Sequence, residues 1–466
     1  MHRKGAKLAR TTVIGGGLAG CEAAWRLAND GHEVTLIEMR PVTTTPAHQT
    51  DHLAELVCTN SFKSTDPSNA HGLLKHEMGG LGSLLLECAR EAAVPAGTAL
   101  AVDREVFARA MTARVTNHPA ITLERREITA VPDSPCVIAT GPLTADALAS
   151  DIRALLGDDG LAFYDSIAPI ISADSIDLGI AWFASRWGKG EGDDYLNCPL
   201  SREEYEAFIA ALRAADTYSG HDWENVPYFE GCLPIEVMAE RGADTLRFGP
   251  MRPVGLRDPR TDKRPWAVVQ LRREDRAGQM WNMVGFQTRL RTGEQRRVFR
   301  TIPGLANAEF LRTGSIHRNT YLNFPARLLP YGAAPARPDI IFAGQLTGVE
   351  GYVESAASGI LAGLNLGRLM DGLEPVIPPH TTMLGALYAY LRSAEPGAFQ
   401  PMNSNFGLIA PLTEHVRDKG ERRTAVVDRA GRDVALWMAT HGITSSMQDS
   451  TVVDETPEFA PAVEHE

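Results

Sequence analysis

The chain has 466 residues, of which 44% are hydrophobic and 22% charged, as is ordinary for a globular enzyme of two or three domains. It contains no run of about eighteen apolar residues, which excludes a membrane-spanning helix, and its basic start leads into a strand rather than a secretory signal. Six cysteines without CxxC spacing exclude a zinc knuckle, a dithiol redox motif and a disulfide framework. We therefore expect a cytoplasmic protein without a metal.

The charge is unevenly distributed along the chain. The net charge is −12, yet the segment from Arg241 to Arg327 contains 18 Lys+Arg against 7 Asp+Glu, a local surplus of +11. Two interpretations stay open at this point. The arginines belong either to an ordinary solvated surface or to a surface that faces a polyanion such as a nucleic acid.

The first forty residues predict a dinucleotide-binding unit. "RTTVIGGGLAG" is a short β-rich run that ends in a GxGxxG turn, "LAGCEAAWRLANDG" has helical spacing, and "HEVTLIEMRP" is a second apolar strand. Such glycines permit a tight turn and close approach to a pyrophosphate at the helix N-terminus, and an acid at the end of the second strand accepts from ribose hydroxyls. The predicted cofactor-binding residues of this unit are Gly15, Gly16, Gly17, Leu18, Ala19, Gly20 and Glu38.

Further elements of the same kind follow along the chain. "LVCTNSFKS" comes after what resembles the end of a helix, and "HGLLKHEMGGLGSLLLECAREAA" reads as a helix in which Cys88 is a packing residue. "CVIATG" is a strand that ends at Gly141. Near the other end, "PDIIFAGQLTGVEGYVESAASGILAG" predicts a strand, a turn with Gly344 and Gly351, and a long helix. The early glycine turn, the "CVIATG" strand and the late strand with its glycine turn and helix, in this order, favour FAD over NAD as the bound cofactor.

These elements predict an α/β fold. A Rossmann-like FAD-binding domain would take residues 1–160 and 326–445, and a smaller mixed α+β insertion domain, with "REEYEAFIAALRAA" as a helix, would take 161–325. The acidic segment 446–466 is predicted to be disordered. No second GxGxxG follows a strand, so a pyridine nucleotide would have no domain of its own.

Two cysteines stand in polar surroundings rather than among apolar residues. Cys58 is followed by Thr59, Asn60 and Ser61, and Cys232 lies between Gly231 and "LPIE". The blocks "RFGPMRPVGLRDP", "MVGFQTRL", "SIHRNTYLNFP" and "FQPMNSNFGL" are dense in polar and aromatic groups without helical or strand periodicity. This pattern is typical of a site built on loops.

Together the motifs resemble one family, TrmFO, the folate- and FAD-dependent tRNA (uracil-5-)-methyltransferases. "VIGGGLAG", "CTNSFKS", "GCLPIEVM", "GQLTGVEGYVESAASG" and "FQPMNSNFGL" carry the resemblance, which covers about residues 10–425. It implies methylation of carbon 5 of the uridine at position 54, in the TΨC loop of tRNA. Methylenetetrahydrofolate would donate the one-carbon unit, and NAD(P)H would reduce the FAD.

The resemblance also implies roles for individual residues. Cys58 and Cys232 would be catalytic: a thiolate that adds to carbon 6 of uracil makes carbon 5 nucleophilic, and the second cysteine would assist proton removal or protect the intermediate. Which cysteine is the nucleophile stays open, and Lys63 or a helix end could lower its pKa. Tyr352 would lie near the isoalloxazine ring. Arg289 replaces a histidine that often stacks on the folate pterin, and with His317 it is a candidate substrate-binding residue.

Three other functions remain as alternatives. The same chemistry could act on a ribosomal RNA uridine, or the chain could be a flavin oxidoreductase acting on a small molecule, or an RNA-binding flavoprotein without catalysis. The basic segment and the two isolated cysteines favour an RNA-modifying enzyme over the oxidoreductase. The two cysteines also argue against a protein that only binds RNA, since binding needs neither.

Overall fold

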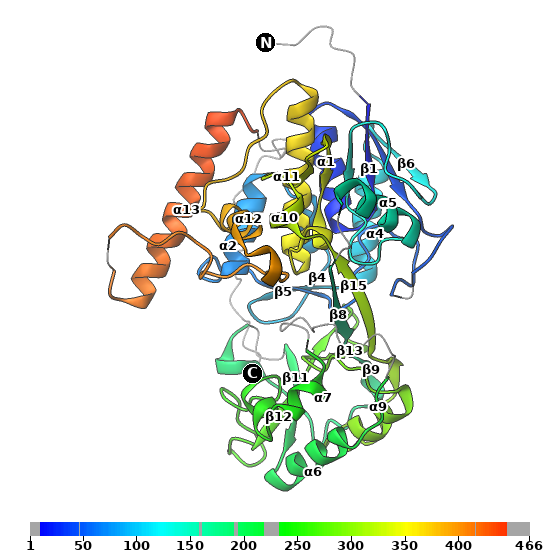
Figure 1. Ribbon diagram of the computed structural model, residues 1–466. Coiled ribbons are helices and arrows are strands. Elements are labelled where there is room, and N and C mark those ends of the chain that lie inside the picture. Colours follow the sequence, from blue (N-terminus) through cyan, green and yellow to red (C-terminus); the bar gives the residue numbers. More distant parts are fainter. Residues whose placement is uncertain are drawn as a thin grey trace, which may run out of the picture.

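The computed structural model describes most of the chain (Figure 1). The described residues are 10–45, 47–157, 161–190, 194–218, 233–414 and 416–444, with 161–167, 315–320 and 419 described by their backbone alone. Cys232 and the predicted tail 446–466 lie outside these residues. His317 is described only through its strand.

The first of two layered parts is built on a six-stranded, mainly parallel sheet in the order β16-β17-β7-β1-β2-β6. Its strands are β1 (Arg10–Ile14), β2 (Glu33–Glu38), β6 (Ile121–Arg125), β7 (Cys136–Ile138), β16 (Ala333–Ala334) and β17 (Arg337–Phe342). Ile14 at the end of β1 lies beside Ile37 and Ile138, so three carboxyl ends meet at one edge. The predicted Rossmann-like α/β fold is confirmed, and this edge is where such sheets bind ligands.

Two helices from opposite ends of the chain pack together over this sheet (Figure 1). They are α1 (Leu18–Asn29) and α11 (Tyr352–Met370). Their backbones touch because α11 has glycine where they meet: a Cβ on Gly359 would stand 2.1 Å from the Ala19 carbonyl oxygen, and one on Gly363 would stand 2.6 Å from that of Ala23. The late helix is thereby fixed against the first one, with both N-termini toward the carboxyl edge of the sheet.

The helical segment after the cysteine motif differs from its prediction. Two helices, α2 (Ala70–Gly80) and α3 (Leu84–Glu91), replace the single expected one, because Gly82 has a φ of 77° and Ser83 caps α3 through the Leu86 amide. Cys88 is fully buried in α3, as predicted. The other elements of this part are β3 (Ser61–Ser64), β4 (Ala93–Val94), β5 (Ala99–Val102), α4 (Arg104–Thr116), α5 (Asp146–Leu156), α10 (Phe324–Arg327), α12 (Met383–Ser393) and α13 (Lys419–His441).

The second part has its own antiparallel sheet and its own apolar core. The strand order is β10-β11-β12-β13-β9-β14, and β8 and β15 form the two-stranded ribbon that joins the two parts in Figure 1. Its strands and helices are β8 (Leu161–Ile167), β9 (Ile170–Ser172), β10 (Trp182–Phe183), β11 (Tyr195–Leu200), β12 (Ala267–Arg273), β13 (Met280–Met283), β14 (Phe310–Arg312), β15 (Ser315–Tyr321), α6 (Arg202–Arg213), α7 (Ile235–Glu240), α8 (Thr245–Phe248) and α9 (Thr292–Phe299). The domain boundaries drawn from the sequence stay a prediction.

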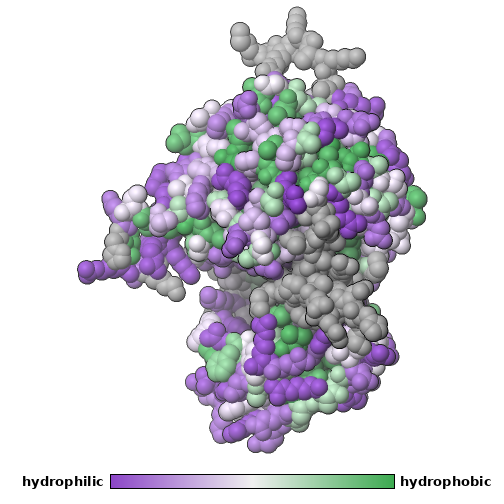
Figure 2. Space-filling view, viewed as in Figure 1, coloured by the Kyte–Doolittle hydropathy of each residue, from purple (hydrophilic) through white to green (hydrophobic). Residues whose placement is uncertain are grey.

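The surface is mostly polar. Hydrophilic residues cover much of the visible face of both parts in Figure 2, with apolar side chains scattered between them. Within the described ranges, no helix combines the length and the apolar character that crossing a bilayer requires.

Candidate cofactor pocket and thiol site

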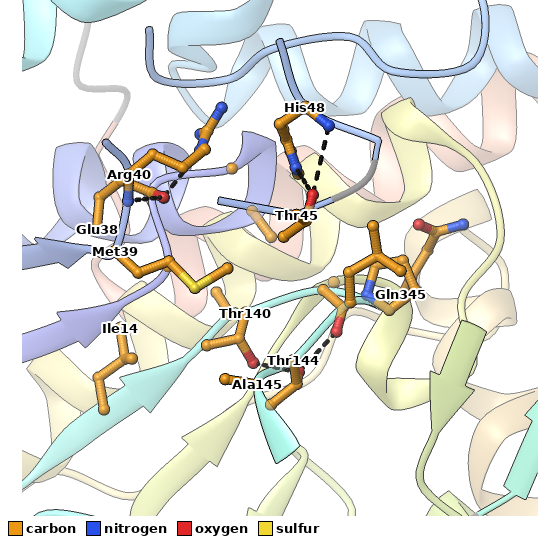
Figure 3. A pocket seen from close by; sticks show the side chains of 18 of the residues that line it. Ile14, Glu38, Met39, Arg40, Thr45, His48, Thr140, Thr144, Ala145 and Gln345 are labelled. Atoms are coloured by element: carbon orange, nitrogen blue, oxygen red, sulfur yellow. Dashed lines mark hydrogen bonds and ion pairs between the residues drawn. The ribbon is translucent and has the colours of Figure 1, made fainter. Parts of the chain in front are cut away.

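A pocket opens at the carboxyl edge of the parallel sheet (Figure 3). The turns after β1, β2 and β7 form its walls, and the first turns of α1 and α11 close it. Of the predicted cofactor residues, those that line the cavity are Gly15, Gly17, Leu18, Ala19, Glu38, Gly141, Gly344 and Tyr352. Gly16, Gly20 and Gly351 are not among the lining residues.

The glycines of the first turn have different physical tasks. Gly15 has a φ of 101°, and a Cβ on Gly20 would stand 1.7 Å from the Gly15 carbonyl oxygen, so both are required for the turn itself. A Cβ on Gly17 would meet nothing within 4 Å. Gly17 therefore leaves open space at the N-terminus of α1, where no side chain caps the helix. A phosphate group fits such a place, because free amides and the helix dipole attract an anion.

Glu38 stands at the end of β2 as a buried carboxylate. It accepts hydrogen bonds from the Gly16 amide (2.7 Å), the Arg40 amide (3.0 Å) and the Arg40 Nε (2.9 Å). Burial alone would raise the pKa of Glu38, but the Arg40 hydrogen bonds and charge, with the Gly16 amide, hold that pKa below its ordinary value. The carboxylate is therefore ionised and fixed beside the turn, with lone-pair capacity left for a hydroxyl donor.

Hydroxyl groups and one imidazole complete the wall opposite Glu38. The Thr140 and Thr144 hydroxyls lie 2.6 Å apart, and Thr144 donates to the Gly141 carbonyl at 2.9 Å. Thr45 Oγ1 lies 2.6 Å from His48 Nδ1 (Figure 3). Sequence reasoning did not select these four side chains, because no local pattern distinguishes them from ordinary loop residues. The open cradle at Gly17, the anchored acid and the polar wall together fit a dinucleotide.

Cys58 lies next to this pocket and differs from the other described cysteines. It is half-buried, whereas Cys21, Cys88, Cys136 and Cys198 are fully buried. The expected helix before it is absent: the segment from 51 to 60 contains only turns and bends. The Tyr352 hydroxyl accepts from the Cys58 amide at 2.7 Å and the Thr59 amide at 3.3 Å. A residue of the pocket wall thus fixes the backbone of the cysteine loop.

Two arginines hold the same loop from other elements. Arg104, at the start of α4, donates to the Leu56 carbonyl at 2.6 Å and to the Cys58 carbonyl at 3.3 Å. Arg272, in β12 of the second part, donates to the Asn60 Oδ1 at 3.1 Å and the Thr59 Oγ1 at 2.8 Å. The loop is therefore fixed by hydrogen bonds from both parts of the molecule.

The electrostatic surroundings of the thiol are cationic. Arg104 and Arg272 hydrogen-bond to the Cys58 loop, and Arg104, Arg272 and Arg312 each interact electrostatically with Cys58. Lys63, the predicted partner, is exposed, and its charge acts on Glu354 and Lys75; its effect on Cys58 stays a prediction. The sequence analysis did not select these arginines. The sequence offered one indication, because "VVQLRRED" places Arg272 and other charged residues at the end of an apolar strand.

The remaining predicted site residues lie in the second part or outside the described chain. Arg289 has its Nε 3.7 Å from Glu236 Oε1, and its amide donates to the same oxygen at 2.7 Å. His317 lies in β15, where its backbone pairs with Asp165 of β8. Cys232 precedes α7 and is not described, so its distance from Cys58 stays a prediction.

The chain matches one protein-family model, "Glucose inhibited division protein A", over residues 10–374. The Aquifex aeolicus GidA structure, in its form II crystal, superposes with a TM-score of 0.67 at 16% identity, covering 94% of this chain and 74% of that one. At that identity the likeness concerns the fold alone. Fold and pocket together define a Rossmann-type flavoprotein.

Relatives with curated names identify the family within this class of flavoproteins. The protein of Geobacter sulfurreducens is 55% identical over 430 residues, covering 92% of this chain and 99% of its own. That of Desulforudis audaxviator is 54% identical over 432 residues, covering 92% and 98%. Both are named "Methylenetetrahydrofolate--tRNA-(uracil-5-)-methyltransferase TrmFO". The chain belongs to the TrmFO family.

Proposed function

We propose that this chain is a methylenetetrahydrofolate–tRNA-(uracil-5-)-methyltransferase. It binds FAD, takes its one-carbon unit from methylenetetrahydrofolate, and methylates carbon 5 of the uridine at position 54 in the TΨC loop. NAD(P)H reduces the flavin. The observation that carries the proposal is a half-buried thiol, Cys58, tied through its own amide to a residue of the cofactor pocket and surrounded by arginines of both parts.

The pocket residues divide the binding of FAD between them. The Gly17 cradle and the first turn of α1 receive the pyrophosphate, and Glu38 accepts from a ribose hydroxyl. Tyr352 forms the wall between the pocket and the cysteine loop. When bound, FAD supplies the reducing equivalents that convert a methylene into a methyl group.

The surroundings of Cys58 suit the first chemical step. Carbon 5 of uracil is a weak nucleophile until a thiolate adds to carbon 6. Arg104 and Arg272 place positive charge beside the loop that carries the sulfur. Arg104 and Arg272 also fix the loop, so the sulfur needs little reorganisation to reach the base. Cys232 is proposed as the second thiol, and Arg289 and His317 as substrate contacts.

Activity and site can be tested together. The purified protein is incubated with methylenetetrahydrofolate, NAD(P)H and unmodified tRNA or ribosomal RNA, and the methylated base is mapped. We expect 5-methyluridine at position 54 of tRNA. Methylation of ribosomal RNA alone would favour the alternative substrate. Flavin turnover without any methylated base would contradict the proposal.

RNA containing 5-fluorouridine tests the thiol chemistry, because fluorine cannot leave as a proton does and the adduct stalls. We expect a covalent protein–RNA band that survives denaturation. Cys58→Ala and Cys232→Ala should each abolish methylation, and Cys58→Ala should also lose the band. Cys88→Ala is the matched control, since that thiol is buried in α3. Methylation that survives in both site variants would exclude this mechanism.

A further inference from the structure

Arg312 reaches from the second part of the molecule to the rim of the cofactor pocket. It ends β14, the edge strand that pairs with β9 at Ile170. Its Nη2 lies 3.5 Å from the carbonyl oxygen of Ala47, at the outer limit of a hydrogen bond. Ala47 stands between Thr45 and His48, which line the pocket. The guanidinium group is therefore placed where the two parts meet and the pocket opens.

Arg312 differs from its two cationic neighbours in what it binds. Arg104 forms an ion pair with Glu274 at 2.6 Å, and Arg272 is satisfied by the side chains of Thr59 and Asn60. Within the described chain, the Ala47 carbonyl is the one hydrogen-bond acceptor of the Arg312 side chain, and no carboxylate lies within ion-pair distance. Burial, and then the charge of Arg104, lower the pKa of Arg312, while Tyr352, Cys58 and Glu274 oppose the shift.

The local charge balance calls for an anion. Among the described residues, Glu274 is the carboxylate that acts on all three guanidinium groups, and one negative charge does not neutralise three positive ones. Five donors in a planar fork suit a phosphate or a carboxylate. Burying a guanidinium group without an anionic partner costs free energy, and a bound phosphate or carboxylate would offset that cost.

We propose that Arg312 binds the phosphodiester group adjacent to the target uridine and so places the base over Cys58. The inference rests on the proposed function. A nucleotide's phosphate is one sugar away from its base, so a cation that shares the surroundings of the attacking thiol lies within reach of it. The carboxylates of a folate are at the opposite end of that molecule from its one-carbon unit, so they would lie farther from the reacting atoms.

A double-mutant cycle between protein and RNA tests the assignment. Binding of an RNA stem-loop is measured with the FAD-loaded protein, wild type or Arg312→Gln. The stem-loop has either an ordinary backbone or one uncharged methylphosphonate linkage, 5′ or 3′ of the target uridine. We expect Arg312→Gln alone, and one of the two neutral linkages alone, each to weaken binding about tenfold. The two changes together should weaken it no further than either alone.

Controls separate this contact from a general charge effect. Arg296→Gln removes an exposed charge from α9 of the same part and should keep full sensitivity to the neutral linkage. Arg312→Lys keeps the charge but not the fork, and should recover part of the affinity. The flavin absorption spectrum reports folding of each variant.

Several outcomes would overturn the inference. One is wild-type binding that neither neutral linkage weakens, and this does not depend on any variant. A second is additive losses at both linkages, and a third is a higher KM for methylenetetrahydrofolate with unchanged RNA binding, which would assign Arg312 to the folate. Failure of the proposed function is distinguishable, because the wild type would then methylate no RNA with an ordinary backbone.

Discussion

Two glycines of the GxGxxG turn have different structural roles, although both belong to the same motif. A Cβ on Gly20 would enter the backbone of Gly15, whereas a Cβ on Gly17 would enter open space. Gly17 also has φ −76° and ψ −171°, an extended conformation that any residue adopts without strain. The protein itself therefore does not need glycine at position 17, and a bound ligand does.

This difference predicts the behaviour of two variants. Gly17→Leu should fold with near-wild-type stability in the absence of FAD but fail to retain the flavin, because the side chain fills the phosphate cradle. Gly20→Ala should lower the yield of folded protein, because helix and turn can no longer approach. The flavin spectrum and the thermal midpoint of the FAD-free protein separate the two. A Gly17→Leu protein that copurifies with a full complement of FAD would contradict the cradle.

At the scale of elements, the first turn of α11 depends on a buried carboxylate. Glu354 is 1% exposed and accepts from the Ser404 amide (3.0 Å), the Ser404 hydroxyl (2.5 Å) and His71 Nδ1 (3.1 Å). Burial opposes its charge, but the His71 hydrogen bond, the Lys63 and His71 charges and the Ser404 hydroxyl outweigh burial and lower its pKa to about 2. One carboxylate thus ties α11 to α2 and to the "FQPMNSNFGL" block.

The lowered pKa predicts a pH-dependent contribution to stability. A group with a depressed folded-state pKa stabilises above its unfolded value, here 4.5, and loses that effect as the pH falls toward 2. Glu354→Gln should therefore cost up to about 3 kcal/mol near pH 7, and the difference should shrink below pH 4.5. Urea unfolding between pH 3.5 and pH 7, at about half-unit steps, measures it. Glu33→Gln, at an exposed position on β2, is the control. A cost that stays constant with pH would show that Glu354 acts through packing alone.

At the scale of the whole molecule, a buried ion pair joins the two parts beside the thiol. Arg104 of α4 meets Glu274, just after β12, at 2.6 Å, and their side chains are 17% and 2% exposed. The same arginine holds the carbonyls of Leu56 and Cys58. The pair therefore couples the contact between the parts to the position of the cysteine loop.

Breaking this pair from either side should be costly. Arg104→Gln and Glu274→Gln should each lower the free energy of unfolding by about 3 kcal/mol, and the double variant by less than their sum, because each single change leaves a buried charge alone. Arg109→Gln is the matched control in α4, where an exposed pair with Glu105 should contribute less than about 0.5 kcal/mol. Urea unfolding gives these values. Additive losses would mean that the two side chains stabilise independently.

The basic segment shows why charge counts alone do not locate a surface. Several of its arginines make contacts within the protein: Arg272 holds the cysteine loop, Arg247 lies over the Trp266 ring at 3.7 Å, and Arg300 donates to the Ala308 carbonyl. Arg297 pairs with Glu294 on the same helix. The surplus of +11 is therefore only in part available to a polyanion.

The sequence by itself determined the elements that local patterns encode. Apolar strands, the glycine turn, Glu38 at the end of β2, Gly344 before the late helix, and the buried Cys88 all follow from periodicity and backbone sterics within a few residues. The family resemblance followed from contiguous motifs of the same kind. The break between α2 and α3 was missed, because apolar residues continue across Gly82 and conceal the turn.

Only the tertiary structure decided what surrounds the thiol. Arg104, Arg272 and Arg312 come from α4, β12 and β14, and in the sequence they are separated from Cys58 by 46 residues in one case and by more than 200 in the others. Tyr352 reaches the Cys58 amide across 294 residues. Local sequence propensities do not predict such contacts, because the contacts form only when the fold brings distant segments of both parts together around one loop. The difference between Gly17 and Gly20 is of the same origin, since it depends on which atoms the fold places beside each Cα.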